Sequence, residues 1–459
     1  MRIFTQHAKY IKMKGINTTK YLDCFFESKS KNTSEWFGYY NYDPLNKDHT
    51  KLLCNRSVDE GKAPQKGVSI ELGYYELADK TWHHIGTSDS WNWQQGAMMQ
   101  WLPGNENKVI YNTSCDNKLI SIIHDIETGL NKEISWPIYG ITPDGKKSIA
   151  LDMERSYWCN AYHYQSVAND EKNQPVVKED GIFEIDLELN ARRRIVSIQS
   201  ILELDPDPDF GELKHWLEHI MISPDGSHFV FLHRFCPKDK MYQYQTRVIL
   251  SKIDGTCLQV LPEWRDYSWS HFGWNGSNGF SLYSIRINNL QRKFISATKD
   301  ISDKKRSNSI RNFVQCLFVK IKGLMPVWFR ELLKGGKASN MYLYYIKSGD
   351  KYLLHKQWRH KLLNIDGHPS FTNDGKYMIT DSYPDINGYQ RLVVMNTENE
   401  KVLELGSFYA SMKGTPASCD LHPKLSSDNY YVTVDSAYNK KHHILVYRLN
   451  WDLIRKTLE

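Results

Sequence analysis

The sequence lacks the features that mark secreted or membrane-spanning proteins. Its 8 cysteines are scattered along 459 residues without a CxxC pair or a dense framework, so we expect reduced thiols. The first residues lack the apolar run of a secretory signal. No stretch approaches the roughly 18 uninterrupted apolar residues that a membrane-spanning helix needs. We therefore expect a cytoplasmic protein.

Several enzyme motifs are missing as well. The chain has no Walker loop, no glycine fingerprint after a strand and no GxSxG nucleophile elbow. Continuous helical periodicity is scarce. Aromatic residues, by contrast, reach 13%, with 14 Trp and 28 Tyr. Such an excess fits carbohydrate handling by ring stacking, but it fits packing on pleated sheets better, and this favours an all-β fold.

Four segments share one pattern of apolar strand, tight turn and second β-rich strand. They are "IYGITPDGKKSIALD" (138–152), "HIMISPDGSHFVFLH" (219–233), "HPSFTNDGKYMITDS" (368–382) and "HPKLSSDNYYVTVDS" (422–436). The Asp-Gly pair supplies the positive φ that a short hairpin needs. Looser copies occupy 37–54, 94–112 and 271–284, which makes seven.

Repeats of this size with strand–turn–strand cores indicate a β-propeller with four strands in each blade. We predict an all-β fold in which residues 1–459 form a single seven-bladed β-propeller. The strand-like runs at 247–253, 391–397 and 443–449 are expected to be outer strands.

Histidines recur at one place in this repeat. When the copies are aligned on the turn, His219, His368 and His422 stand at the start of the first strand, and His271 matches within one residue. That strand is the innermost in a propeller blade, so the four side chains are expected to meet at one mouth of the central channel. A lone histidine on an apolar strand is usually a packed core residue, but four at one repeat position favour a site.

The spacing of the histidines reveals an insert between blades 5 and 6. His271 and His368 are 97 residues apart, whereas the neighbouring intervals are 52 and 54 residues. The surplus coincides with residues 291–337, which hold 12 lysines and arginines against 3 acids, a net charge of +9. Because the whole chain has a net charge of +6, the rest of it sums to −3. Apolar residues at helical spacing predict a basic amphipathic helical insert, broken near Gly323 and Pro326.

Two interpretations of this insert remain open. A basic amphipathic helix with Trp and Phe is typical of peripheral contact with a membrane surface. The same pattern also suits a helical hairpin that packs on a blade or on a partner subunit. Nucleic acid is not an expected partner, because no binding motif accompanies the charge.

Several motifs resemble those of a known family of propellers. They are "WFGYYNYDP", "WNWQQGAMMQWLPG", "VIYN", "PIYGITPDG", "ISPDGSHFVFLHR", "SHFGW", "DGHPSFTNDGKYMITDSYPD" and "CDLHPKLSSDN". Together they resemble seven-bladed oligogalacturonate lyases and, more distantly, propeller ulvan lyases, in a group often encoded in bacterial surface-polysaccharide loci. The resemblance covers most of residues 36–450 apart from the insert.

The resemblance implies cleavage of uronate polysaccharides by β-elimination, with histidines and a glutamine holding a divalent metal and a further histidine as base. His271 and His368 match the metal positions, and His233 is the nearest counterpart of the base. The second histidine and the glutamine expected around His368 are missing, so His422 is the candidate substitute on geometry. His219, from the same converging set, is a further catalytic candidate. The expected cofactor is Mn, Zn or Ca.

Other candidates lie in neighbouring motifs. Tyr162, in "CNAYHYQ", resembles part of a tyrosine motif of the ulvan-type relatives and is a candidate acid or base. Arg155 and Arg234 are candidate clamps for a substrate carboxylate. Gln94 and Trp93, from the second blade, are candidate substrate contacts.

Two functions fit these observations. The first is a lyase-like enzyme that acts on an acidic, uronate-containing oligosaccharide or polysaccharide and serves surface polysaccharide metabolism. The alternative is a non-catalytic propeller that binds glycan or protein and assists capsule or O-antigen assembly at the inner membrane. Converging histidines support the enzyme, whereas the basic insert and the incomplete catalytic patterns favour the alternative.

Overall fold

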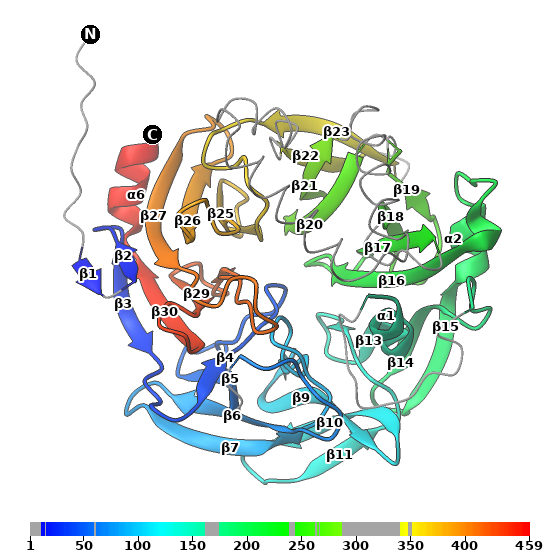
Figure 1. The fold of residues 1–459 in the computed structure, drawn as a ribbon, viewed down its shortest axis with the longest axis horizontal. Coiled ribbons are helices and arrows are strands. Elements are labelled where there is room, and N and C mark those ends of the chain that lie inside the picture. Colours follow the sequence, from blue (N-terminus) through cyan, green and yellow to red (C-terminus); the bar gives the residue numbers. More distant parts are fainter. Residues whose placement is uncertain are drawn as a thin grey trace, which may run out of the picture.

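The computed structural model describes residues 11–13, 15–58, 61–160, 174–237, 244–261, 264–265, 267–286, 340–347 and 351–459. Their strands form seven antiparallel sheets, which Figure 1 shows as a ring around a central axis. This arrangement is a β-propeller, so the predicted all-β fold is confirmed. The predicted insert, 291–337, and the candidate Tyr162 lie outside the described residues.

Five of the sheets contain four strands each that are consecutive along the chain. The first three are β4 (Ser34–Trp36), β5 (Lys51–Ser57), β6 (Ile70–Glu76), β7 (Thr81–Ser88); β8 (Gln100–Leu102), β9 (Asn105–Cys115), β10 (Lys118–Asp125), β11 (Asn131–Ile134); and β12 (Gly140–Ile141), β13 (Lys147–Leu151), β14 (Gly181–Asp186), β15 (Ala191–Ser197). The next two are β16 (Leu213–Ile222), β17 (His228–Pro237), β18 (Gln245–Lys252), β19 (Gln259–Val260); and β20 (Tyr267–Asn275), β21 (Gly279–Arg286), β22 (Asn340–Lys347), β23 (Lys351–Trp358). Figure 1 places fourth strands such as β7, β15 and β23 at the rim, so first strands face the axis.

The last two sheets recruit strands from the N-terminal region. The sixth holds β24 (Ser370–Phe371), β25 (Tyr377–Asp381), β26 (Tyr389–Asn396) and β27 (Val402–Tyr409), extended by β2 (Ile16–Thr18) and β1 (Ile11–Met13). The seventh holds β28 (Lys424–Leu425), β29 (Tyr431–Ser436), β30 (His443–Leu449) and β3 (Leu22–Glu27). Because β3 pairs with β30, the two ends of the chain close the ring together. The predicted outer strands at 247–253, 391–397 and 443–449 are third strands. One more strand lies outside the first and the last of them, and β27, β2 and β1 lie outside the second.

The helices in the described part of the chain are short and connect or flank the sheets. They are α1 (Met153–Asn160), α2 (Ile198–Glu203), a 3-10 turn (Phe210–Glu212) and α6 (Trp451–Leu458). Helix α6 buries Ile454 and Leu458 in the apolar cluster between the sixth and seventh sheets. No described helix has the length and apolar character to cross a bilayer.

The four predicted hairpin turns share one stabilising contact. The hydroxyl of the residue before the turn donates to the turn aspartate at 2.5–2.6 Å, in the pairs Thr142–Asp144, Ser223–Asp225, Thr372–Asp374 and Ser426–Asp428. The next position has a φ of 63–71°, taken by glycine in three turns and by Asn429 in the fourth. The repeat read from the sequence therefore corresponds to a repeated structure.

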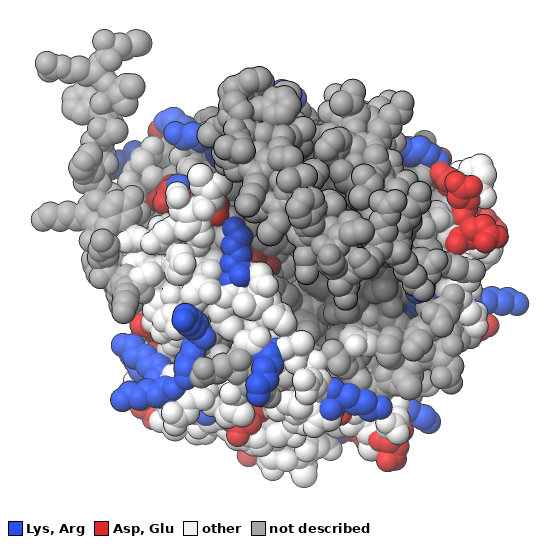
Figure 2. Space-filling view, viewed as in Figure 1, with Lys and Arg blue, Asp and Glu red and all other residues white. Residues whose placement is uncertain are grey.

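The apolar core lies between neighbouring sheets. Ile110 of β9, Ile149 of β13 and Phe229 of β17, for example, belong to one cluster and are fully buried. The strand alternation that identified the repeat supplies these inward-facing residues. Figure 2 shows described basic and acidic side chains interspersed around this face, which accords with the small net charge outside the insert.

The first predicted hairpin, 37–54, is not a simple hairpin. Strand β4 ends at Trp36, and the segment 37–43, here called the axial loop, contacts the inner ends of other sheets before β5 begins. Asn41 donates to the Ile220 carbonyl at 3.2 Å, and Lys424 donates to the Asn41 carbonyl at 3.0 Å. The loop thus ties together the first, fourth and seventh sheets.

Asp435 of β29 secures the start of the axial loop. Its carboxylate accepts hydrogen bonds from the backbone N–H of Phe37 at 3.0 Å and of Gly38 at 2.7 Å. Gly38 has a φ of 106°, and a Cβ there would stand 2.7 Å from the Gln95 carbonyl carbon. Only glycine fits this backbone without displacing the neighbouring sheet.

Candidate active site at the propeller axis

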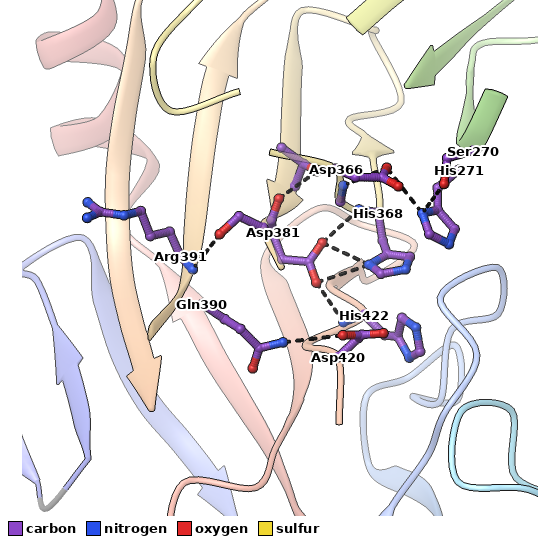
Figure 3. A network of polar contacts seen from close by, with 12 residues as sticks. Ser270, His271, Asp366, His368, Asp381, Gln390, Arg391, Asp420 and His422 are labelled. Atoms are coloured by element: carbon purple, nitrogen blue, oxygen red, sulfur yellow. Dashed lines mark hydrogen bonds and ion pairs between the residues drawn. The ribbon is translucent and has the colours of Figure 1, made fainter. Parts of the chain in front are cut away.

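Four histidines from four sheets meet at the axis, as the sequence predicts. His219 lies on β16 and His271 on β20, whereas His368 and His422 stand two residues before β24 and β28. Consecutive ring centroids along the chain are 5.7, 4.1 and 4.3 Å apart. We call this group the axial histidine row, and Figure 3 shows its last three members.

The local backbone turns these side chains toward one another. The pairing register shifts between Glu218 and Met221, so His219 sits in a β-bulge, and an equivalent shift surrounds His271 in β20. His219 and His422 have φ of 56° and 46°, in the left-handed region that residues other than glycine seldom adopt. Such backbone conformations cost free energy and cluster at functional sites.

Three of the four imidazoles have a carboxylate beside Nδ1. The distances are 3.3 Å for His219 and Glu218, 3.3 Å for His271 and Asp366, and 3.0 Å for His368 and Asp381. A carboxylate at one ring nitrogen fixes the orientation of the ring and leaves the other nitrogen to bind a metal or take a proton.

Asp381 organises two members of the row at once. Its Oδ1 accepts from the His368 backbone N–H at 2.7 Å, and its Oδ2 accepts from the His422 backbone N–H at 3.3 Å. Figure 3 shows this carboxylate lying between the two histidines. Because one carboxylate holds both backbone N–H groups, it fixes how far apart His368 and His422 lie.

Among the described residues, His368, Asp420 and His422 form the one group whose ligand atoms could hold a metal ion. One nitrogen or oxygen from each lies within 4.8 Å of the others. Gln390 of β26 donates from Nε2 to the Cys419 carbonyl at 3.0 Å, and the same amide nitrogen lies 3.5 Å from Asp420 Oδ1. Burial, together with the charge of Asp381, raises the pKa of Asp420 to about 7.

Tyr40 of the axial loop packs against the row. Its ring centroid lies 4.8 Å from that of His368, 5.8 Å from His271 and 5.9 Å from His422. The preceding residue, Tyr39, lies 6.0 Å from His219. The axial loop thus supplies one wall of the histidine site.

Burial and charge divide the row into two kinds of imidazole. Burial lowers the pKa of His219 to about 4, although the Glu218 carboxylate opposes it. Burial, and then the neighbouring histidines, also lower the pKa of His368 and of His422. Burial lowers the pKa of His271 too, but nearby carboxylates, Asp366 first, outweigh it and raise the value.

His233, the predicted base, lies in a different environment. Its Nε2 is 2.9 Å from Nδ1 of His215, and the two rings stack with centroids 5.1 Å apart. His215 Nε2 in turn contacts the Phe210 carbonyl at 2.7 Å. His233 is fully buried and no described contact joins it to the axial row, so its catalytic role stays a prediction.

The two predicted arginine clamps are engaged within the protein. Arg155 is buried and donates to the backbone carbonyls of His215, Gln174 and Pro175. Arg234 Nη1 donates to Glu218 Oε2 at 2.5 Å. These contacts are structural ones, and binding of a substrate carboxylate by either residue stays a prediction.

The two candidates from the second blade differ in position. Gln94 donates to the Ser418 carbonyl at 2.9 Å, and its side chain also hydrogen-bonds Asp420, which places it beside the possible metal group. Trp93 is 3% exposed, packs against Trp36 and donates to the Lys62 carbonyl. Its indole belongs to an apolar core cluster, and the substrate contact of Trp93 stays a prediction.

Sequence reasoning missed the carboxylates and the tyrosine of the site. An acid lies directly before His219, and acids lie two residues before His368 and His422. This recurring acid-before-histidine pattern was available in the sequence as a signal. Asp381 and Tyr40 had no comparable signal, because their partners are 13 or more residues away.

Comparisons with known proteins agree with the fold. No protein-family model and no curated protein sequence matches the chain. Among solved structures, an oligogalacturonate lyase in complex with manganese is similar, with a TM-score of 0.57, 14% identity, and coverage of 97% of this chain and 99% of that one. An oligogalacturonate lyase from Vibrio parahaemolyticus is also similar, with a TM-score of 0.56, 15% identity, and coverage of 96% and 98%. At these identities the likeness confirms the predicted resemblance for the propeller fold alone.

Proposed function

We propose that this protein is a propeller lyase that cleaves uronate-containing oligosaccharides by β-elimination with the help of a divalent metal. The observation that carries the proposal is the group of His368, Asp420 and His422 beside two further axial histidines. The fold shared with oligogalacturonate lyases, one of them in complex with manganese, supports it.

The donor set fits a transition metal. Two imidazoles and one carboxylate suit Mn or Zn, whereas Ca prefers ligands that are all oxygen. The contact of His368 with Asp381 is the kind of outer contact that orients a metal-ligating histidine. When bound by His368, Asp420 and His422, the metal would neutralise the uronate carboxylate and so acidify the neighbouring C5 proton.

The remaining steps belong to side chains of the site. Elimination breaks the C5–H bond, forms the C4–C5 double bond and releases the C4 oxygen with the electron pair of its bond. We assign His219 as the base, since its low pKa leaves it neutral near pH 7 and its ring faces the axial row. Tyr40, which contacts three of the histidines, is assigned as the acid that protonates the leaving oxygen.

The test is a direct assay on the full chain. We expect purified protein with added Mn to cleave at least one of a panel of uronate oligosaccharides, measured as ultraviolet absorbance of the new double bond. His368→Ala should remove both bound metal and activity, whereas His84→Ala, an exposed histidine on β7, should change neither. Binding of the oligosaccharides without any new absorbance would overturn the lyase and support the glycan-binding alternative.

A further inference from the structure

Glu218 is a buried carboxylate held by contacts from two strands. It is fully buried, and it accepts a hydrogen bond from Trp216 Nε1 at 2.6 Å and another from Arg234 Nη1 at 2.5 Å. Trp216 and Glu218 lie two residues apart on β16, and Trp216 pairs directly with Arg234 on β17. A buried charge needs such partners, and these two fix the plane and position of the carboxylate.

The third contact of this carboxylate is with the axial histidine row. In a regular strand the residue after Glu218 would point to the opposite face of the sheet. The β-bulge and the left-handed φ of 56° at His219 instead bring Nδ1 of that histidine to 3.3 Å from Glu218 Oε2. The same backbone turns the imidazole toward His271, with ring centroids 5.7 Å apart.

We propose that Glu218 is a positioning residue that fixes the tautomer of His219. Because a carboxylate only accepts hydrogen bonds, it selects the imidazole form with the proton on Nδ1. The lone pair then lies on Nε2, the nitrogen on the far side of the ring from Glu218. This inference rests on the proposed function, in which His219 takes the C5 proton. It adds Glu218 as the group that keeps Nε2 of this base unprotonated.

Glu218→Gln tests this assignment with little change in shape. With the amide oxygen at the Oε1 position, accepting from Trp216, the amide nitrogen takes the Oε2 position beside Arg234 and His219, where it donates and so favours the opposite tautomer. We expect kcat to fall roughly 100-fold with KM within about twofold, because the substrate contacts are unchanged. Glu184→Gln is the matched control. Glu184 of β14 is also a buried glutamate paired with an arginine, Arg193, but this pair lies in the third sheet and not in the sheet of Glu218.

A double variant separates positioning from general stability. His219→Asn removes the base, and asparagine tolerates the left-handed backbone at this position. If Glu218 acts through His219, adding Glu218→Gln to His219→Asn should cost no further activity. Losses that multiply, or a Glu218→Gln enzyme as active as Glu184→Gln, would overturn the inference. If Glu218→Gln does not fold, Glu218→Asp, which keeps the charge but withdraws it by one methylene, takes its place.

A readout independent of activity keeps this inference distinct from the lyase itself. In protein labelled with 15N-histidine, His219 should show a protonated Nδ1 in the wild type, and the proton should move to Nε2 in Glu218→Gln. Unchanged 15N signals would refute the role of Glu218 even if the wild type is an active lyase. The expected tautomer change in a protein inactive on every uronate substrate would support the positioning contact while the proposed function fails.

Discussion

The inner ends of the third and seventh sheets occupy the same place in the repeat but differ in chemistry. Ile138 precedes β12 at the position that His422 holds before β28. The backbone N–H of Ile138 bonds to the Asn112 side chain of the preceding sheet at 2.8 Å, and that of His422 bonds to Asp381 at 3.3 Å. One end is buried scaffold, and the other is part of the candidate metal group.

This comparison shows how a structural contact is reused in a site. A polar residue of a second strand, Asn112 or Asp381, secures the start of the next sheet. Asp435 of another second strand secures the start of the axial loop in the same way. Where that residue is Asp381, the same carboxylate also orients the His368 imidazole. The buried end and the candidate metal group therefore differ at two equivalent positions. Asp381 stands where the other sheet has Asn112, and His422 stands where it has Ile138.

The largest effect is expected when Asp381 is converted to the residue of the other sheet. Asp381→Asn has one acceptor oxygen where the carboxylate has two. It should keep the backbone contact with His422, as Asn112 does with Ile138, but lose the charge beside His368 and the contact with the His368 backbone N–H. Outer partners of metal-ligating histidines are worth ~10–100-fold in metal affinity, and we expect a loss in that range. Isothermal titration with Mn measures it. Asp23→Asn, at an exposed position, is the control, and equal affinities for the two variants would contradict the role of Asp381.

A second effect concerns pH and ring closure. Burial raises the pKa of Asp435 to about 7, although two backbone N–H groups oppose the shift. The folded protein therefore keeps this proton between about pH 4 and pH 7, where the unfolded chain has lost it, so the stability contribution falls as pH rises through that window. Asp435→Asn should remove a pH-dependent part of about 3 kcal/mol between about pH 5 and about pH 8. Thermal unfolding at about pH 5 and about pH 8 measures this, and an unchanged pH dependence would contradict it.

The sequence predicted the repeat and the meeting of the histidines, because both follow from local patterns. The hairpin turns repeat Ser or Thr, Asp and Gly at fixed spacing. Equivalent positions in the blades of a propeller lie at the same distance from its axis, so histidines at one repeat position must meet. For the same reason Ile138 could be recognised as the member of the set without an imidazole.

Other parts of the site depend on contacts that span many residues. Tyr40 reaches the histidines because the axial loop leaves the first sheet, and nothing in "FGYYNYDP" specifies that path. His233 resembles a base by alignment, but no pattern in the sequence indicates that His215, which contacts the Phe210 carbonyl, stacks on it. Closure of the seventh sheet by β3 likewise needs partners more than 400 residues apart.

A smaller effect is expected at the opposite end of the hairpins. Gly145 has a φ of 69°, and a Cβ there would stand 2.0 Å from the Pro103 carbonyl oxygen. Gly145→Ala should therefore cost about 2 kcal/mol, combining backbone strain with a clash that must displace the second sheet. Gly129→Ala is the matched control, since its φ is 70° but no atom lies within 4 Å of the added Cβ. Equal unfolding temperatures for the two variants would show that the contact with Pro103 relaxes freely.

The smallest effect sharpens the contrast between the turn end and the axial end of one hairpin. Asp225 accepts from Ser223 Oγ at 2.6 Å and from Ser227 N at 3.0 Å, and these bonds, against some burial, lower its pKa. Its contribution is therefore present above the ordinary pKa of an aspartate and is lost as pH falls through the lowered value, opposite in sign to Asp435. Asp225→Ala should cost about 1 kcal/mol of stability near pH 7 and leave kcat and metal affinity unchanged. A change in activity with an unaltered unfolding temperature would mean that turn and axis are coupled, and that the division between scaffold and site is wrong.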